Sequence, residues 1–142
     1  MTVSLQITDA PSPAEVEAVR GALREANAAS GFPDNTRLLS LLLRDADGRV
    51  VGGLQGRTVW SWLYTENLAV PPGLRGAGWG TRLLAAAEDE ARARGCIGAR
   101  LDTYTFQARG FYEKRGYRVV GAIEDCPPGQ TRFTMTKRLD GR

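Results

Sequence analysis

The chain has 142 residues, which is enough for one domain with its own hydrophobic core. Apolar residues make up 42% and charged residues 25%, a balance that excludes an intrinsically disordered chain. A net charge of +3 is too small to indicate nucleic-acid binding, and the lack of histidine excludes Ser-His-Asp and Cys-His catalysis and the usual histidine-bearing metal sites. We therefore predict a single domain over residues 1–142 with no metal and no nucleic-acid partner.

The compartment is predicted from what the sequence lacks. No apolar stretch is long enough to span a bilayer, and the first residues have neither the basic nor the apolar region of a signal peptide. Cys96 and Cys126 form no CxxC pair and indicate neither a disulfide framework nor a thiolate metal site. We expect a cytoplasmic protein without a membrane partner, with one buried thiol and one loop thiol.

The first predicted elements are a strand and a helix. Val3, Leu5 and Ile7 alternate with polar residues, which predicts a strand over 3–7. The segment 12–15 reads Ser-Pro-Ala-Glu, a capping box that begins a helix, and Gly31 ends it. The side expected to face the core carries Val16, Val19, Leu23 and Ala26.

Three strands are predicted next. The first covers 38–43, and a turn at 45–48, with Gly48 in a left-handed conformation, leads to a second over 50–54. Aromatic and β-branched residues predict one long strand over 58–70, which ends at Pro71 because proline cannot donate to a ladder.

The second half alternates helices and strands. A glycine-rich turn at 73–80 leads into a helix over 81–94 that Gly95 ends, followed by a strand over 97–101 and a short helix over 107–115. Strands over 117–120 and 131–137, linked by a turn at 127–129, complete the chain. The order β-α-β-β-β-α-β-α-β-β predicts a mixed α/β sheet.

The glycine-rich turn is the most informative segment. A strand, a turn with Gly76, Gly78 and Gly80, and the start of a helix bring free backbone N–H groups to one place, where the helix dipole favours an anion. Glycine permits close approach of the backbone, and Arg75 adds a positive charge, so a phosphate is the expected ligand.

Three phosphate-binding patterns fit such a turn to different degrees. A P-loop needs a lysine after its glycine, and the chain has Thr81 directly after Gly80. A dinucleotide fingerprint lacks its third glycine, although Asp102 lies at about the interval expected for a ribose-binding acid. The third pattern, Arg/Gln-x-x-Gly-x-Gly/Ala, is complete in Arg75, Gly78 and Gly80.

This third pattern resembles the acetyl-CoA turn of the GNAT (Gcn5-related N-acetyltransferase) family. The segment 66–80 is similar to the family's strand four, turn and helix three. The segment 101–117, with Phe111-Tyr112-Glu113-Lys114 and Gly116-Tyr117, is similar to its strand five and following helix. The resemblance covers nearly the whole chain and implies the GNAT fold, a mixed and largely antiparallel sheet splayed between the family's strands 4 and 5.

The resemblance also implies where acetyl-CoA binds. The pantetheine arm would pair with the main chain of the strand before the turn, and the pyrophosphate would bind the amides of the turn. Gln107 matches a family position near the cofactor. The implied cofactor-binding residues are Leu68, Ala69, Val70, Arg75, Gly76, Ala77, Gly78, Trp79, Gly80, Thr81 and Gln107.

The implied reaction is attack of a neutral amine on a thioester, without a covalent enzyme intermediate. Tyr112 matches the tyrosine beside the sulfur and is the candidate acid, since a phenol keeps its proton at neutral pH. The alternative is that Tyr112 only packs against Phe111. Glu66, acting through a water, is the candidate base; the alternatives are an ion-pair role for Glu66 and Asp102 as the base.

The acceptor is predicted only by class. Strand alternation places Glu66 on one face with Tyr64, Leu68 and Val70. Trp60, Trp62 and Tyr64 share that face, as core or as an aromatic wall for an amine. Glu124 and Asp125 could attract a cationic amine or form a solvated loop.

We expect an N-acetyltransferase acting on a small-molecule primary amine. The alternatives are an acyl-CoA-binding module without turnover and a nicotinamide-dependent oxidoreductase. Family members often dimerise through their last strands, so a homodimer is one expectation and the oligomeric state stays open.

Overall fold

A computed structural model describes residues 1–142, which divide into two compact units, residues 1–34 and residues 35–142. The first unit contains one helix, α1 (Pro13–Ala29), and the second contains every other element. No helix is both long and apolar enough to cross a bilayer. The single domain expected over residues 1–142 stays a prediction.

The first unit confirms the predicted helix start but not the predicted strand. Ser12 Oγ accepts from the Glu15 amide at 3.1 Å, and Glu15 Oε1 accepts from the Ser12 amide at 2.8 Å, so the capping box is complete. Residues 3–7 form no strand, because alternation alone supplies no ladder partner and this unit contains no other strand. Within the first unit α1 buries no residue, and the inward side expected for Val16, Val19, Leu23 and Ala26 stays a prediction.

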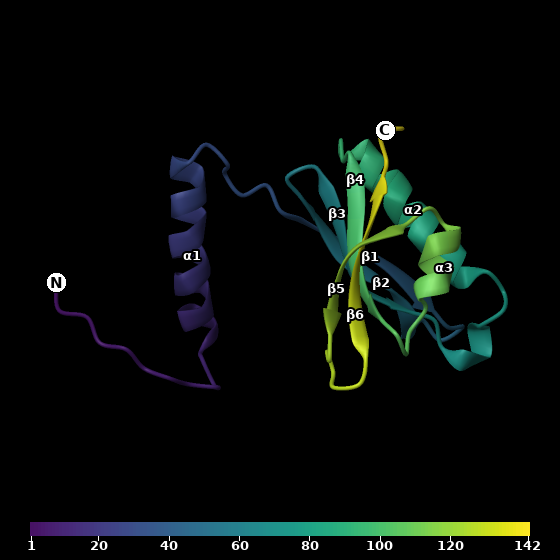
Figure 1. The fold of residues 1–142 in the computed structure, drawn as a ribbon, viewed down its shortest axis with the longest axis horizontal. Helices are drawn as coiled ribbons and strands as arrows, with labels where there is room; N and C mark the ends of the chain where they lie inside the picture. The colour runs from purple at the N-terminus through teal and green to yellow at the C-terminus, as the bar shows by residue number, and fades with distance from the viewer. The chain divides into compact units, whose positions relative to one another are not determined.

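The second unit is built on a six-stranded mixed sheet in the order β1-β2-β3-β4-β6-β5 (Figure 1). All neighbouring strands are antiparallel except β3 and β4, which are parallel. The strands are β1 (Arg37–Arg44), β2 (Val50–Val59), β3 (Trp62–Ala69), β4 (Gly98–Tyr104), β5 (Arg118–Glu124) and β6 (Thr131–Arg138). The other elements are the 3₁₀ helix η1 (Pro72–Leu74) and the helices α2 (Trp79–Ala93) and α3 (Arg109–Lys114).

The predicted long strand over 58–70 is wrong. Trp60 and Ser61 have φ values of 48° and 67°, and they make a tight turn that joins β2 to β3 as a hairpin. Such turns usually carry glycine or asparagine, and the absence of both from these positions hid the turn. The number of strands between the first two helices is still three, and because residues 3–7 form no strand the observed order is α-β-β-β-α-β-α-β-β.

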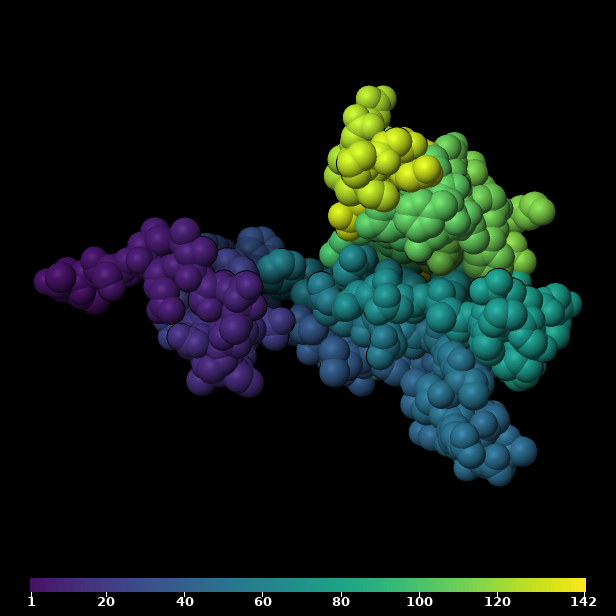
Figure 2. Space-filling model, turned by 90° about the horizontal axis from the view of Figure 1, so that it is seen from below, coloured from purple at the N-terminus to yellow at the C-terminus, as the bar shows by residue number.

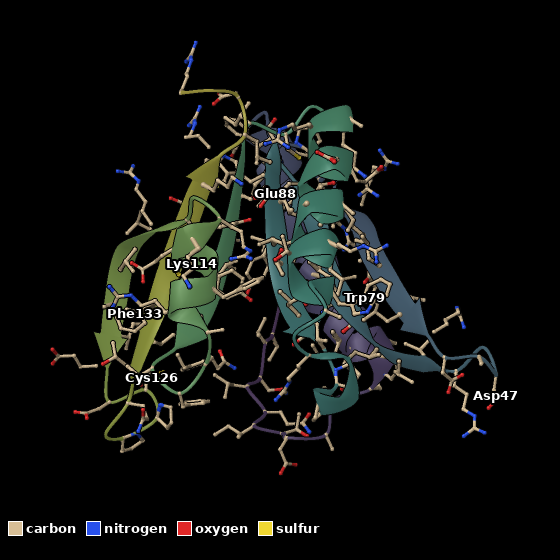
Figure 3. The ribbon with its side chains drawn as sticks, turned by 90° about the vertical axis from the view of Figure 1, so that its right-hand side faces the viewer. Asp47, Trp79, Glu88, Lys114, Cys126 and Phe133 are labelled. Carbon is tan, nitrogen blue, oxygen red and sulfur yellow. The ribbon has the colours of Figure 1, made fainter.

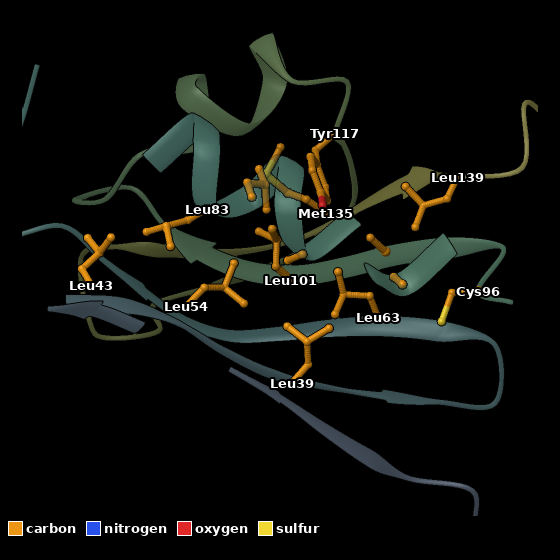
Figure 4. Packing of buried hydrophobic residues seen from close by; sticks show 14 residues of the cluster. Leu39, Leu43, Leu54, Leu63, Leu83, Cys96, Leu101, Tyr117, Met135 and Leu139 are labelled. Carbon is orange, nitrogen blue, oxygen red and sulfur yellow. The ribbon is translucent and has the colours of Figure 1, made fainter. Parts of the chain in front are cut away.

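The core of the second unit lies between the sheet and α2, with α3 on the same side of the sheet (Figures 1 and 4). The predicted inward residues of α2, namely Leu83, Leu84, Ala87 and Ala91, are all buried. They pack with buried residues of the strands, among them Leu54, Leu63, Leu101 and Met135. Cys96 is buried and Cys126 lies in the β5–β6 loop, as expected.

Candidate active site

The site begins where the sheet splits. The strands β3 and β4 pair only from Trp62 with Gly98 to Thr65 with Leu101, although both strands continue beyond this point. The rest of β4 pairs with β6 and the rest of β3 with β2, so the two halves of the sheet separate after Thr65. This split confirms the splayed sheet predicted from the resemblance.

A bulge in β3 decides which way the next side chains point. Thr65 pairs with Gly56 and Asn67 with Gln55, which leaves Glu66 as the extra residue. The bulge reverses the alternation, so Leu68 pairs with the buried Leu54 and packs against the core. The prediction that Glu66 shares a face with Leu68 and Val70 is therefore wrong.

The glycine turn ends at the start of α2. Gly76 and Gly78 have φ values of 82° and 80°, a conformation that glycine adopts without strain. The first helical hydrogen bond runs from the Arg82 amide to the Gly78 carbonyl at 3.0 Å. The amides of residues 79–81 precede it and have no acceptor within the helix. The helix begins two residues earlier than predicted, which brings Trp79 and Gly80 into its first turn.

Positive charge surrounds this helix start. Arg75 Nε donates to the Val70 carbonyl at 3.1 Å and closes the turn. The Arg82 guanidinium lies 4.0 Å from the Trp79 ring centroid, and Arg115 Nε donates to Thr81 Oγ1 at 3.1 Å. With the helix dipole, this arrangement suits a phosphate.

A cavity of about 520 Å³, which we call the turn cavity, lies beside the helix start. All the predicted cofactor-binding residues line it except Ala77 and Gln107. It also reaches Leu74, Ala108, Phe111 and Tyr112. In Figure 2 the teal turn before α2 and the green segment around α3 lie on adjoining parts of the surface.

A second cavity of about 500 Å³, the split cavity, lies where β3 and β4 separate. Glu66, Asp102 and Gln107 line it, together with Thr65, Asn67, Leu101, Thr103 and Phe106. The residues that line both cavities are Leu68, Ala69, Arg75, Ala108 and Tyr112. The two cavities therefore meet at Tyr112.

Tyr112 is held by aromatic neighbours. Its ring packs edge-on against Phe111, with centroids 5.2 Å apart, and against Tyr117 at 5.9 Å. Burial raises the pKa of the Tyr112 phenol above its ordinary value near 10. Tyr112 thus packs against Phe111, as the alternative expected, and also presents a protonated phenol to both cavities.

The two candidate bases differ in their partners. Asp102 accepts hydrogen bonds from Arg132 at 2.8 Å, Thr134 at 2.9 Å and Tyr64 at 3.4 Å. Burial opposes the charge of this carboxylate, but these hydrogen bonds and the Arg132 charge outweigh it and lower the pKa of Asp102.

Glu66 is less enclosed than Asp102. Its side chain is 38% exposed and that of Asp102 is 17% exposed. Its one ion-pair partner is Arg57, which also lies 5.0 Å from the Tyr64 ring centroid. Glu66 therefore has both the predicted ion pair and access to the split cavity, and its carboxylate can still reach water.

Several predicted residues lie elsewhere. Gln107 lines the split cavity instead of the turn cavity, and its Oε1 accepts from the Tyr104 amide at 3.2 Å. Trp60 is in the β2–β3 turn and Trp62 lies against Gly98, and neither lines the two cavities. Glu124 is the last residue of β5 and Asp125 begins the β5–β6 loop, and neither lines the two cavities.

The sequence analysis did not assign six residues that line the split cavity, namely Thr65, Asn67, Leu101, Thr103, Phe106 and Ala108. Phe106 is 61% exposed and stacks on Tyr104 with centroids 5.2 Å apart. An aromatic residue in a polar loop was the available signal. Thr65 and Asn67 had none, because their places depend on the split and the bulge.

Comparison with known proteins identifies the family. Residues 6–117 match the model of the Acetyltransferase (GNAT) family. A blasticidin-S acetyltransferase of Streptomyces morookaense is 48% identical over 93 residues, 65% of this chain and 68% of that protein. Acetyltransferase Atu2258 of Agrobacterium fabrum is 40% identical over 127 residues, 89% of this chain and 93% of that protein. The chain belongs to the GNAT acetyltransferase family and is an acyltransferase.

Solved structures agree on the fold. An acetyltransferase from Bacillus cereus has 29% identity and a TM-score of 0.79, covering 94% of this chain and 97% of that one. An aminoglycoside 6′-N-acetyltransferase solved with coenzyme A has 19% identity and a TM-score of 0.66, covering 95% and 96% of the two chains. The GNAT fold is confirmed, and neighbours with this fold bind coenzyme A.

Proposed function

We propose that this acyltransferase moves the acetyl group of acetyl-CoA to a primary amine of a small cationic molecule by direct attack in a ternary complex. The observation that supports this proposal is that the turn cavity and the split cavity meet at Tyr112. The turn cavity lies beside a helix start suited to phosphate, and the split cavity is lined by carboxylates and amides. Each substrate then has its own cavity, and the reacting atoms meet between them.

The turn cavity suits acetyl-CoA. The amides of residues 79–81, the left-handed Gly76 and Gly78, and the guanidinium of Arg75 would hold the pyrophosphate. Main-chain groups of residues 68–69 lie on the edge of β3 that β4 leaves unpaired, and Val70 directly follows them. The amides of the pantetheine arm would add there like a strand.

Two residues of the split cavity carry out the two proton transfers: Glu66 is the base and Tyr112 is the acid. The acceptor nitrogen forms a bond to the thioester carbonyl carbon, and the C–S bond breaks with its electron pair on sulfur. The Glu66 carboxylate takes the proton that the nitrogen loses, through a water, and Tyr112 gives its phenolic proton to the thiolate. Asp102 stays ionised and fixes Arg132 and Thr134.

The split cavity favours a cationic acceptor with a planar ring. Glu66 and Asp102 supply carboxylate oxygens, although each is paired with an arginine. Asn67 and Gln107 supply amides, and the exposed ring of Phe106 offers a stacking surface. The similarity to a blasticidin-S acetyltransferase supports an acceptor of this kind.

The test is release of free thiol from acetyl-CoA in the presence of single amines. The panel contains blasticidin S, an aminoglycoside and an aliphatic diamine, and we expect the fastest release with blasticidin S. Release with none of them, together with a higher melting temperature in coenzyme A, would favour the binding module without turnover. A melting temperature raised by NAD and unchanged by coenzyme A would favour the oxidoreductase.

A further inference from the structure

The hydroxyl of Thr65 is one of two buried side-chain polar atoms without a hydrogen-bond partner, and the other is Nε of Arg132, whose guanidinium is otherwise paired with Asp102. Thr65 is 5% exposed, and its Oγ1 makes no hydrogen bond with the protein. The other buried polar residues are all paired: Thr58 with Arg94 at 3.2 Å, Thr103 with Gln107 at 3.3 Å, and Glu88 with Tyr117 and Lys137. A buried hydroxyl without a partner destabilises a fold, so its presence calls for a reason.

The position of Thr65 supplies that reason. It is the last residue of β3 that pairs with β4, so it lies at the vertex of the split. It lines the split cavity and directly precedes Glu66, the candidate base. A valine would have the same shape, suit a strand and leave no unpaired polar atom.

We propose that Thr65 Oγ1 accepts a hydrogen bond from the acceptor's attacking amine and fixes its direction of approach. This inference rests on the proposed function, because it needs the acceptor in the split cavity. The contact leaves the nitrogen lone pair free for the thioester carbon and a second N–H free to point towards the water beside Glu66. Thr65 is thus an acceptor-binding residue at the closed end of the cavity.

Two variants at this position separate binding from folding. Thr65→Val removes the hydroxyl at constant shape, and Thr65→Ser keeps it. We expect Thr65→Val to lower kcat/KM for the amine about tenfold, the loss of one hydrogen bond, with KM for acetyl-CoA unchanged. Its melting temperature should equal or exceed that of the wild type, and Thr65→Ser should keep most of the activity.

Thr58→Val is the matched control. Thr58 is equally buried, but its hydroxyl is paired with Arg94 and lines neither cavity. This variant should therefore lose stability and keep its activity, the reverse of Thr65→Val.

The outcomes distinguish the two proposals. If Thr65→Val keeps the wild-type kcat/KM for the amine, or melts well below the wild type, the hydroxyl serves the fold or a structural water, and the inference is overturned. If the wild type itself releases no thiol with any amine, the proposed function fails first.

Discussion

In the proposed mechanism the leaving thiolate takes its proton from the phenol of Tyr112. Burial keeps it protonated, and its ring is fixed between Phe111 and Tyr117. Tyr112→Phe should lower kcat at least about tenfold, since general acid catalysis contributes this much or more. The rise in melting temperature with coenzyme A should stay as in the wild type, and an unchanged kcat would remove the acid role.

If the Glu66 carboxylate is the base, its removal should lower kcat/KM by a factor that depends on pH. Glu66→Gln cannot take a proton, so kcat/KM should fall about tenfold or more near neutral pH, where the amine is charged. At higher pH the amine loses its proton to solvent, and the gap to the wild type should narrow. A gap that stays constant across the pH–rate profile would show that Glu66 only holds Arg57.

For Asp102 we expect a pH-dependent contribution to the unfolding free energy and not to the catalytic rate. Because its folded pKa is lowered, its contribution is fully present above its unfolded pKa of about 4 and is lost as the pH falls through the folded pKa. Asp102→Asn should cost roughly 1–3 kcal/mol of unfolding free energy at pH 7, and this difference should shrink in acid. Urea unfolding at several pH values measures it, and a difference independent of pH would contradict the assignment.

At the scale of elements, α2 is tied to the C-terminal strands through Glu88. Its carboxylate accepts from Lys137 on β6 at 2.7 Å and from the Tyr117 hydroxyl at 2.9 Å. Figure 3 shows Glu88 on the side of α2 that faces these strands, with Trp79 at the helix start. This network joins α2 to β6 and to Tyr117, which directly precedes β5.

Removing the Glu88 carboxylate should lower the free energy of unfolding. Glu88→Ala leaves the Lys137 charge without its partner and should lower the unfolding free energy by about 3 kcal/mol, measured by urea unfolding. Replacing both residues by methionine removes the charge as well, so the double variant should recover part of the loss, although the Tyr117 hydroxyl stays without its acceptor. Equal instability of the single and double variants would contradict this account.

The elements also show how far the sequence predicts this molecule. Local signals placed α1, α2 and the β1–β2 turn correctly, because a capping box, a 3.6-residue period and Gly48 act within a few residues. The Trp60–Ser61 turn and the bulge at Glu66 were missed, because neither position carries a residue typical of its conformation. The predicted cofactor residues, except Ala77 and Gln107, lie around one cavity, and their role stays a prediction. The lining of the split cavity depends on strand pairing and was predicted only in part.

On the scale of the molecule, charge is unevenly distributed. Residues 1–34 carry 2 basic and 5 acidic side chains, and residues 35–142 carry 17 basic and 11 acidic side chains. The second unit thus has a formal charge of +6, and coenzyme A is strongly anionic. Coenzyme A should therefore bind several-fold more weakly at roughly 0.5 M than at roughly 0.05 M NaCl, as measured by calorimetry. An affinity independent of salt would contradict an electrostatic contribution.

The bulge in β3 has a consequence for how such an enzyme can change over time. The extra residue takes up the shift in alternation, so Leu63 and Thr65 before it and Leu68 after it keep their places towards the core. Glu66 and Asn67, which are exposed and line the split cavity, are thereby released from the packing that constrains their neighbours. We expect substitutions at Asn67 to change the acceptor preference at little cost to stability, whereas Glu66 is held by its proposed role as the base.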